Sequence, residues 1–81
     1  MLMISTNLRR FRTELTGPKV SQEAIARQAG LSLQWYRLLE KGRQEKTSYT
    51  TARNILAAIN AERQTRGQKT LSLDDLGLTI V

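Results

Sequence analysis

The chain has 81 residues, with no cysteine and no histidine, and its 13 Lys and Arg outnumber its 7 Asp and Glu to give a net charge of +6. A chain of this length makes a single domain, residues 1–81, whose core is too small to enclose a substrate cavity. Without cysteine or histidine it lacks disulfides, the usual zinc ligand sets and an imidazole base, so we expect no metal, no cofactor and no enzymatic activity. The positive charge favours a polyanionic partner, although it also fits a solubility role or a membrane surface.

We expect no membrane association. No apolar segment approaches the roughly 18 residues that are needed to cross a bilayer. The apolar start of the chain, MLMI, is too short for the core of a secretory signal. We therefore predict that the protein is cytoplasmic.

A first helix is predicted over about residues 6–15. Apolar residues recur there at the spacing of one helical face, namely Ile4, Leu8, Phe11 and Leu15. Ser5 is available as an N-cap, and Gly17 with Pro18 ends the pattern.

Two short helices follow, over about residues 21–29 and 32–41. Ser21 and Ser32 stand at N-cap positions, and Gly30 between them is the residue best able to adopt a left-handed turn at a helix end. Because the connection is so short, the two helices must cross at a steep angle. This is the geometry of a helix-turn-helix unit.

The second of these two helices is crowded with apolar residues, and the helical period divides them between its faces. Three side chains point inward, namely Leu31, Tyr36 and Leu39. Four lie at the exposed N-terminal edge, namely Ser32, Leu33, Gln34 and Arg37. Trp35 and Leu38 lie on the flanks.

The remaining chain completes an all-α domain of five helices with a core over residues 6–63. Residues 42–48 form a polar loop, and a fourth helix is predicted over about 49–63 on the apolar stripe Ala52, Ile55, Leu56 and Ile59. In the segment 64–81, Ser72 and the acidic pair Asp74 and Asp75 indicate a short fifth helix, because carboxylates stabilise the first turn. Residues 78–81 are predicted to be a short extended tail, with Met1–Ile4 as its candidate pairing partner.

Residues 21–32, SQEAIARQAGLS, resemble the lambda-repressor-like helix-turn-helix proteins, also called the xenobiotic-response-element family. Counted from Gln22, the shared pattern has a small Ala at the fifth place, Gly at the ninth and Ser at the eleventh. The resemblance covers roughly residues 6–60 and continues in LLEKG and in SYTTARNILAAI. It implies a compact five-helix DNA-binding domain with the helix-turn-helix as helices two and three.

The resemblance also implies roles for individual residues. Side chains that meet base edges in the major groove are Ser32, Leu33, Gln34 and Arg37. Side chains that bind phosphates are Gln22, Trp35, Lys41, Arg43 and Lys46. Arg12 and Glu40 match a partly buried ion pair that ties the first helix to the end of the recognition helix.

These roles have a chemical basis and structural alternatives. The Gln34 amide suits adenine, the Arg37 guanidinium suits guanine or a phosphate, and Leu33 suits a thymine methyl. Leu33 and Leu38 stand where many family members have polar base readers, so recognition depends in part on DNA shape and methyl contacts. Trp35 fits a core edge and a DNA contact equally well. The basic residues after the third helix also fit a solvated loop.

The C-terminal half has more apolar residues than a short fifth helix needs, namely Ala57, Ile59, Leu71, Leu73, Leu76, Leu78, Ile80 and Val81. Either a second copy covers them, through the end of the fourth helix, the fifth helix and the tail, or the tail packs against the first helix. Helix-turn-helix proteins usually read two half-sites, which favours a homodimer.

The sequence therefore predicts a transcriptional regulator that binds double-stranded DNA sequence-specifically as a homodimer, with a recognition helix over about 32–41 in the major groove. Repressor and activator both remain open. The alternative is a protein-interaction module, or an antitoxin whose main role is to bind a partner protein such as a toxin.

Overall fold

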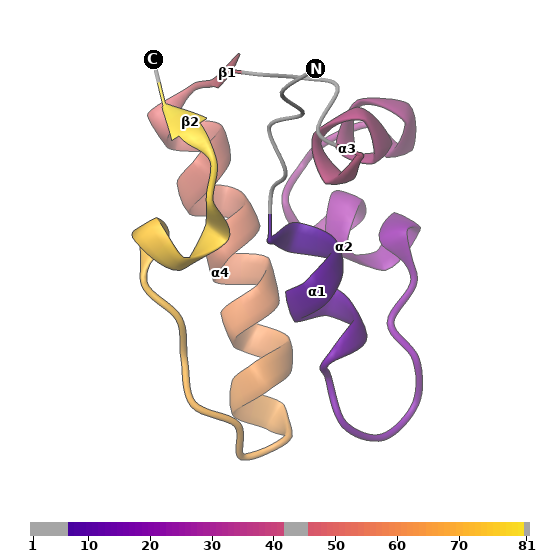
Figure 1. The fold of residues 1–81 in the computed structure, drawn as a ribbon. Coiled ribbons are helices and arrows are strands. Elements are labelled where there is room, and N and C mark those ends of the chain that lie inside the picture. The colour runs from indigo at the N-terminus through magenta and orange to yellow at the C-terminus, as the bar shows by residue number, and fades with distance from the viewer. Residues whose placement is uncertain (1–6, 42–45, 81) are drawn as a thin grey trace.

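The computed structural model describes residues 7–41 and 46–80, and for Lys46, Thr79 and Ile80 it describes the backbone alone. Within these ranges the elements are α1 (Leu8–Thr13), α2 (Gln22–Gln28), α3 (Leu33–Glu40), β1 (Lys46–Thr47), α4 (Tyr49–Thr65), the 3-10 helix η1 (Leu73–Leu76) and β2 (Thr79–Ile80). The all-helical prediction is confirmed, since the two strands hold only two residues each (Figure 1).

Serine caps begin three of the four α-helices in the described ranges. The hydroxyls of Ser21, Ser32 and Ser48 accept hydrogen bonds from the backbone amide three positions later, at 3.1, 3.2 and 3.1 Å. Such a cap satisfies one of the amides that the first turn of a helix leaves unpaired. The predicted starts of α2, α3 and α4 are therefore correct to within one residue.

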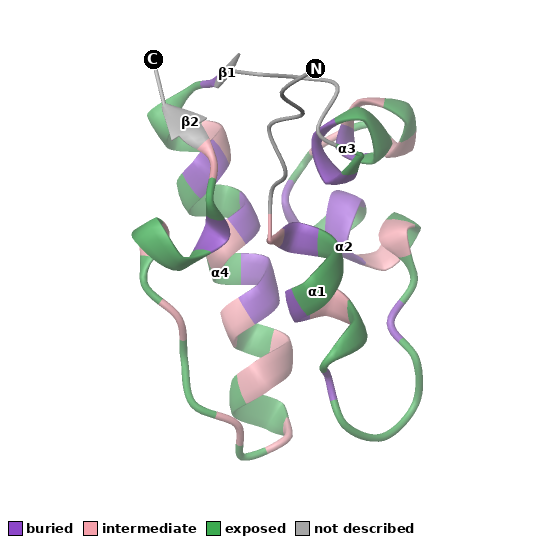
Figure 2. Ribbon diagram, viewed as in Figure 1, coloured by how far each residue is buried: buried purple, intermediate pink, exposed green. Residues whose placement is uncertain are grey.

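The core lies between α4 and the three shorter helices. Figure 2 shows the buried stripe along α4 facing α1 and α2, with exposed residues on the opposite side. The largest fully buried side chains come from five different elements: Leu8, Ile25, Tyr36, Leu39, Ile55, Ile59 and Leu76. The predicted inward stripe of the fourth helix thus forms the centre of the core, as Ile55 and Ile59 have no exposed surface.

The predicted fifth helix is a single turn of 3-10 helix and not an α-helix. The Asp75 carboxylate accepts hydrogen bonds from the Ser72 amide and hydroxyl, which starts the turn. Gly77, with a φ of 68°, ends it after four residues. Because a left-handed residue at this point reverses the chain, no further helical turn is added.

This C-terminal segment packs against the first helix. The Asn7 backbone amide donates to the Leu76 carbonyl at 2.9 Å, and the Asn7 side chain donates to the Asp75 carbonyl at 2.9 Å. Leu76 is fully buried, and Leu71, Leu73 and Leu78 pack against the core. Of the two interpretations of the apolar C-terminus, the described residues thus support packing within the chain.

The extended tail pairs with residues 46–47, which the sequence assigns to a polar loop. Lys46 lies opposite Thr79 and Thr47 opposite Ile80 in a parallel arrangement. Parallel pairing needs a long connection between the strands, and α4 with η1 supplies it. The predicted partner of the tail, Met1–Ile4, lies outside the described residues.

The helices of the described ranges are all too short or too polar to cross a bilayer.

Candidate nucleic-acid interface

Four residues, 29–32, join α2 to α3. Gly30 has a φ of 72°, and its amide and that of Leu31 donate to carbonyls in the last turn of α2, Arg27 at 3.2 Å and Ala26 at 2.8 Å. A Cβ at Gly30 would have nothing within 4 Å, so a side chain would fit there. Glycine is favoured at this position because of its positive φ. The positive φ of Gly30 lets the chain reverse direction after α2. The Ser32 cap then starts α3 two residues later.

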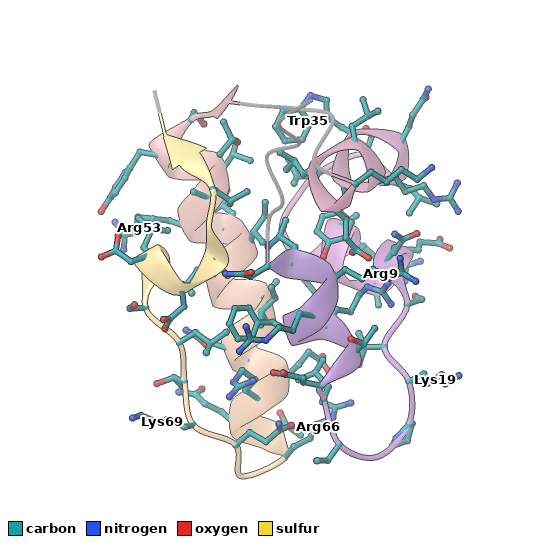
Figure 3. The ribbon with its side chains drawn as sticks, in the orientation of Figure 1. Arg9, Lys19, Trp35, Arg53, Arg66 and Lys69 are labelled. Atoms are coloured by element: carbon teal, nitrogen blue, oxygen red, sulfur yellow. The ribbon has the colours of Figure 1, made fainter. Side chains whose placement is uncertain are left out.

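The inner face of α3 follows the prediction. Tyr36 and Leu39 have no exposed surface, and Leu31 is half-buried against the core. Trp35, labelled in Figure 3, is also half-buried and packs against the same core. Trp35 is expected from the sequence to lie either at the edge of the core or against DNA, and its packing directly supports the position at the edge of the core.

The outer face of α3 carries the predicted base-reading residues. Ser32, Gln34 and Arg37 are exposed. Leu33 is half-buried and, together with Ala26 of α2, lines a shallow surface pocket, so only part of its side chain faces outward. Three of the four residues are thus free of covering protein within the described ranges.

A partly buried ion pair connects α1 to the end of α3. Arg12 donates from Nη2 to Glu40 Oε1 at 2.7 Å and from Nε to Glu40 Oε2 at 3.1 Å. The Glu40 side chain is 2% exposed. Burial alone would raise the pKa of this carboxyl, but the hydrogen bonds and the charge of Arg12, together with the Gln22 amide, outweigh burial and hold that pKa below its ordinary value. The predicted ion pair is confirmed.

Gln22 extends this ion pair to the outer face of α3. Its Nε2 donates to Glu40 Oε1 at 3.1 Å, and its Oε1 accepts from Arg37 Nε at 3.3 Å. We call Arg12, Glu40, Gln22 and Arg37 the polar chain. The resemblance implies a phosphate contact for Gln22, and no local spacing in the sequence predicts these two bonds. One hydrogen of its amide remains for an outside acceptor, so the phosphate contact stays a prediction.

The other predicted phosphate contacts are only partly described. Lys41 follows the last residue of α3 and is exposed. Lys46 belongs to β1, and the structure describes its backbone but not its side chain. Arg43 lies outside the described residues. Their predicted role therefore stays a prediction.

A polar pocket of about 290 Å³ lies beside the polar chain, lined by Arg9, Arg12, Gln22, Glu40 and Lys41. Figure 3 shows Arg9 on α1, on the side that faces α2. Sequence reasoning leaves Arg9 out of the site. Helical spacing could have predicted this position for Arg9. The resemblance already pairs Arg12 with Glu40 at the end of α3, and residues three apart on a helix share a face.

Comparison of the chain with protein-family models gave no match, and comparisons with curated proteins and with solved structures gave none either. In the part of the chain that the structure describes, no group of three acidic side chains comes together to hold a metal ion.

Proposed function

We propose that the chain is a sequence-specific, double-stranded DNA-binding transcriptional regulator in which α2 and α3 form a helix-turn-helix unit. The observation that carries this proposal is the exposure of Gln34 and Arg37 on α3 and of its N-cap Ser32. A helix that exposes such side chains fits the major groove, which admits one α-helix. The net charge of +6 favours a polyanionic ligand.

The polar chain gives Arg37 a defined role in this proposal. Its Nε is held by Gln22, and no described group binds its two terminal nitrogens. Two terminal N–H groups match the O6 and N7 acceptors of guanine. The exposed Gln34 amide matches adenine in the same way. Arg37 and Gln34 are therefore the side chains that we expect to read bases through hydrogen bonds.

The proposed regulator acts as a homodimer. This part rests on the two half-sites that such proteins usually read, spaced about one turn of DNA apart. Apolar surface gives the homodimer less support, because much of the C-terminal apolar segment packs within the chain and needs no second copy to cover it.

The test is selection of bound duplexes from a random pool, followed by affinity measurements on the winning sequence. Arg37→Ala should lower affinity about 5- to 150-fold, since a bidentate base contact contributes about 1–3 kcal/mol. Arg53→Ala is the matched control, because Arg53 lies on α4, away from α3 (Figure 3), and should leave affinity nearly unchanged.

A palindrome in the selected duplexes would support the homodimer. Absence of duplex binding at low salt, together with retention of a partner protein by the same chain, would replace this proposal with the protein-interaction module.

A further inference from the structure

Residues 14–21, which connect α1 to α2, make a wide loop (Figure 1). A pocket of about 230 Å³ lies between this loop and the end of α1, and we call it the loop pocket. It is lined by Arg12 and Thr13 of α1 and by Leu15, Lys19 and Val20 of the loop. The loop pocket shares only Arg12 with the polar pocket, so the two are separate.

Side chains from outside the loop hold its backbone in place. Arg12 Nη1 donates to the Val20 carbonyl at 3.0 Å. From the segment after α4, Gln68 Oε1 accepts from the Thr16 amide at 3.0 Å, and Arg66 Nε donates to the Thr16 carbonyl at 2.6 Å. The loop is thus fixed at its middle and near its end. The pocket is therefore formed before a ligand arrives, as is usual for sites that bind small molecules.

Part of the lining of the loop pocket is apolar. Leu15 and Val20 belong to the core and are only 7% and 8% exposed. A dry cavity of about 150 Å³ is known to hold a benzene ring. At about 230 Å³, the loop pocket therefore has room for one six-membered ring with a small polar group beside it.

The polar part of the lining favours an anion. The exposed Lys19 side chain makes no hydrogen bond or ion pair with any described residue. Figure 3 shows Lys19 extending from the loop away from α1, and its flexible stem lets the ammonium turn over the mouth of the pocket. Arg12 uses three of its five N–H groups on Glu40 and Val20, which leaves two for a ligand. Because Glu40 offsets the charge of Arg12, Lys19 supplies the one uncompensated charge of the lining.

We propose that the loop pocket binds a small monocarboxylate that carries an apolar ring. The ring lies against Leu15 and Val20, and the carboxylate accepts charge-assisted hydrogen bonds from Lys19 and from the remaining N–H groups of Arg12. One carboxylate matches the one uncompensated charge of the lining, whereas a more highly charged anion would bring charge that nothing in the lining offsets. This site goes beyond the proposed DNA binding and does not depend on it.

The first arm of the test compares three small molecules on the wild-type chain. Each is titrated at constant ionic strength, and NMR follows the backbone amides of Thr13 and Lys19. Benzoate should give saturable shifts with a dissociation constant on the order of 1 mM, the range for a ligand of its size. Benzamide has the same shape without the charge and should bind about fivefold more weakly. Acetate has the charge without the ring and should bind at least about tenfold more weakly, because it buries little apolar surface.

The second arm repeats the benzoate and benzamide titrations on two variants. Lys19→Gln should weaken benzoate about fivefold, the loss expected for one partly exposed ion pair, and should leave benzamide unchanged. Lys69→Gln is the matched control, because it removes the same charge from an exposed lysine at a distant site (Figure 3) and should leave both ligands unchanged. Since both lysines are exposed, neither substitution disturbs the core.

Saturable benzoate shifts that weaken on loss of the charge, of the ring and of Lys19 would support the site. Three results would each overturn it: no saturable shifts with benzoate, equal binding of benzoate and acetate, or equal benzoate binding by Lys19→Gln and Lys69→Gln. None of these titrations uses DNA. Failure of the loop pocket therefore leaves the proposed regulator intact, and failure of duplex binding leaves the loop pocket intact.

Discussion

At the scale of single residues, Gln22 links the fold to the proposed interface, because it hydrogen-bonds to both Glu40 and Arg37. It is the one side chain of the polar chain that contacts both the partly buried ion pair and the exposed Arg37. A hydrogen bond to a charged partner contributes more than one between neutral groups. Gln22 therefore stabilises the fold and orients a side chain of the proposed interface at the same time.

Gln22→Ala should lower the free energy of unfolding by about 1–2 kcal/mol, because the nearly buried Glu40 carboxylate loses a donor. The measurement is urea unfolding. Gln28→Ala is the matched control, since the exposed Gln28 also donates to a glutamate, Glu62, whose side chain is 24% exposed against 2% for Glu40. That control should cost below about 0.5 kcal/mol, and an equal loss in both variants would contradict the role of Gln22.

Glu40 should make the fold sensitive to acid. Its pKa in the folded chain lies below the ordinary value of 4.5. A group with a depressed folded pKa contributes stability that is present above its unfolded pKa and lost as the pH falls through its folded pKa. Carbon NMR of the carboxyl should show a titration midpoint below 4.5, and urea unfolding should show stability falling below that pH. A midpoint above 4.5 would refute this account.

At the scale of elements, local signals explain most helix boundaries. A serine cap acts on an amide three residues away, so it is visible in the sequence. The start of the first helix differs from its prediction for a tertiary reason. Asn7, the residue before α1, makes no side-chain cap and donates to the C-terminal segment instead.

Gly30→Ala tests the connection between α2 and α3. An alanine at a φ of 72° should cost about 1 kcal/mol through the backbone alone. Gly67→Ala is the control, because Gly67 has a φ of 70° and equally free space after α4. Both variants should lose similar stability in urea, and only Gly30→Ala should weaken duplex binding. Equal duplex affinity in the two variants would show that the α2–α3 turn does not govern binding.

At the scale of the whole molecule, the C-terminal segment completes the core. Leu76 is fully buried and its carbonyl binds the start of α1. Leu76→Ala should therefore cost about 2–5 kcal/mol in urea unfolding. Leu38→Ala, at a residue that is 37% exposed, is the control and should cost below about 1 kcal/mol. A small loss for Leu76→Ala would mean that the segment is dispensable for folding.

The sequence by itself determined the features that act over a few residues. These are the helix starts at serine caps, the turn at Gly30 and the inward face of α3, all of which follow from capping and from the helical period. The Arg12–Glu40 ion pair joins distant segments, and only the resemblance to a known fold implied it.

Only the tertiary structure decided the contacts between segments that are far apart in the chain. Gln22 and Glu40 are 18 residues apart, and Asn7 and Asp75 are 68 apart. The pairing of β2 with β1 and the pocket at Arg9 belong to the same class. Such contacts depend on how whole helices pack, and no local spacing of residues encodes that.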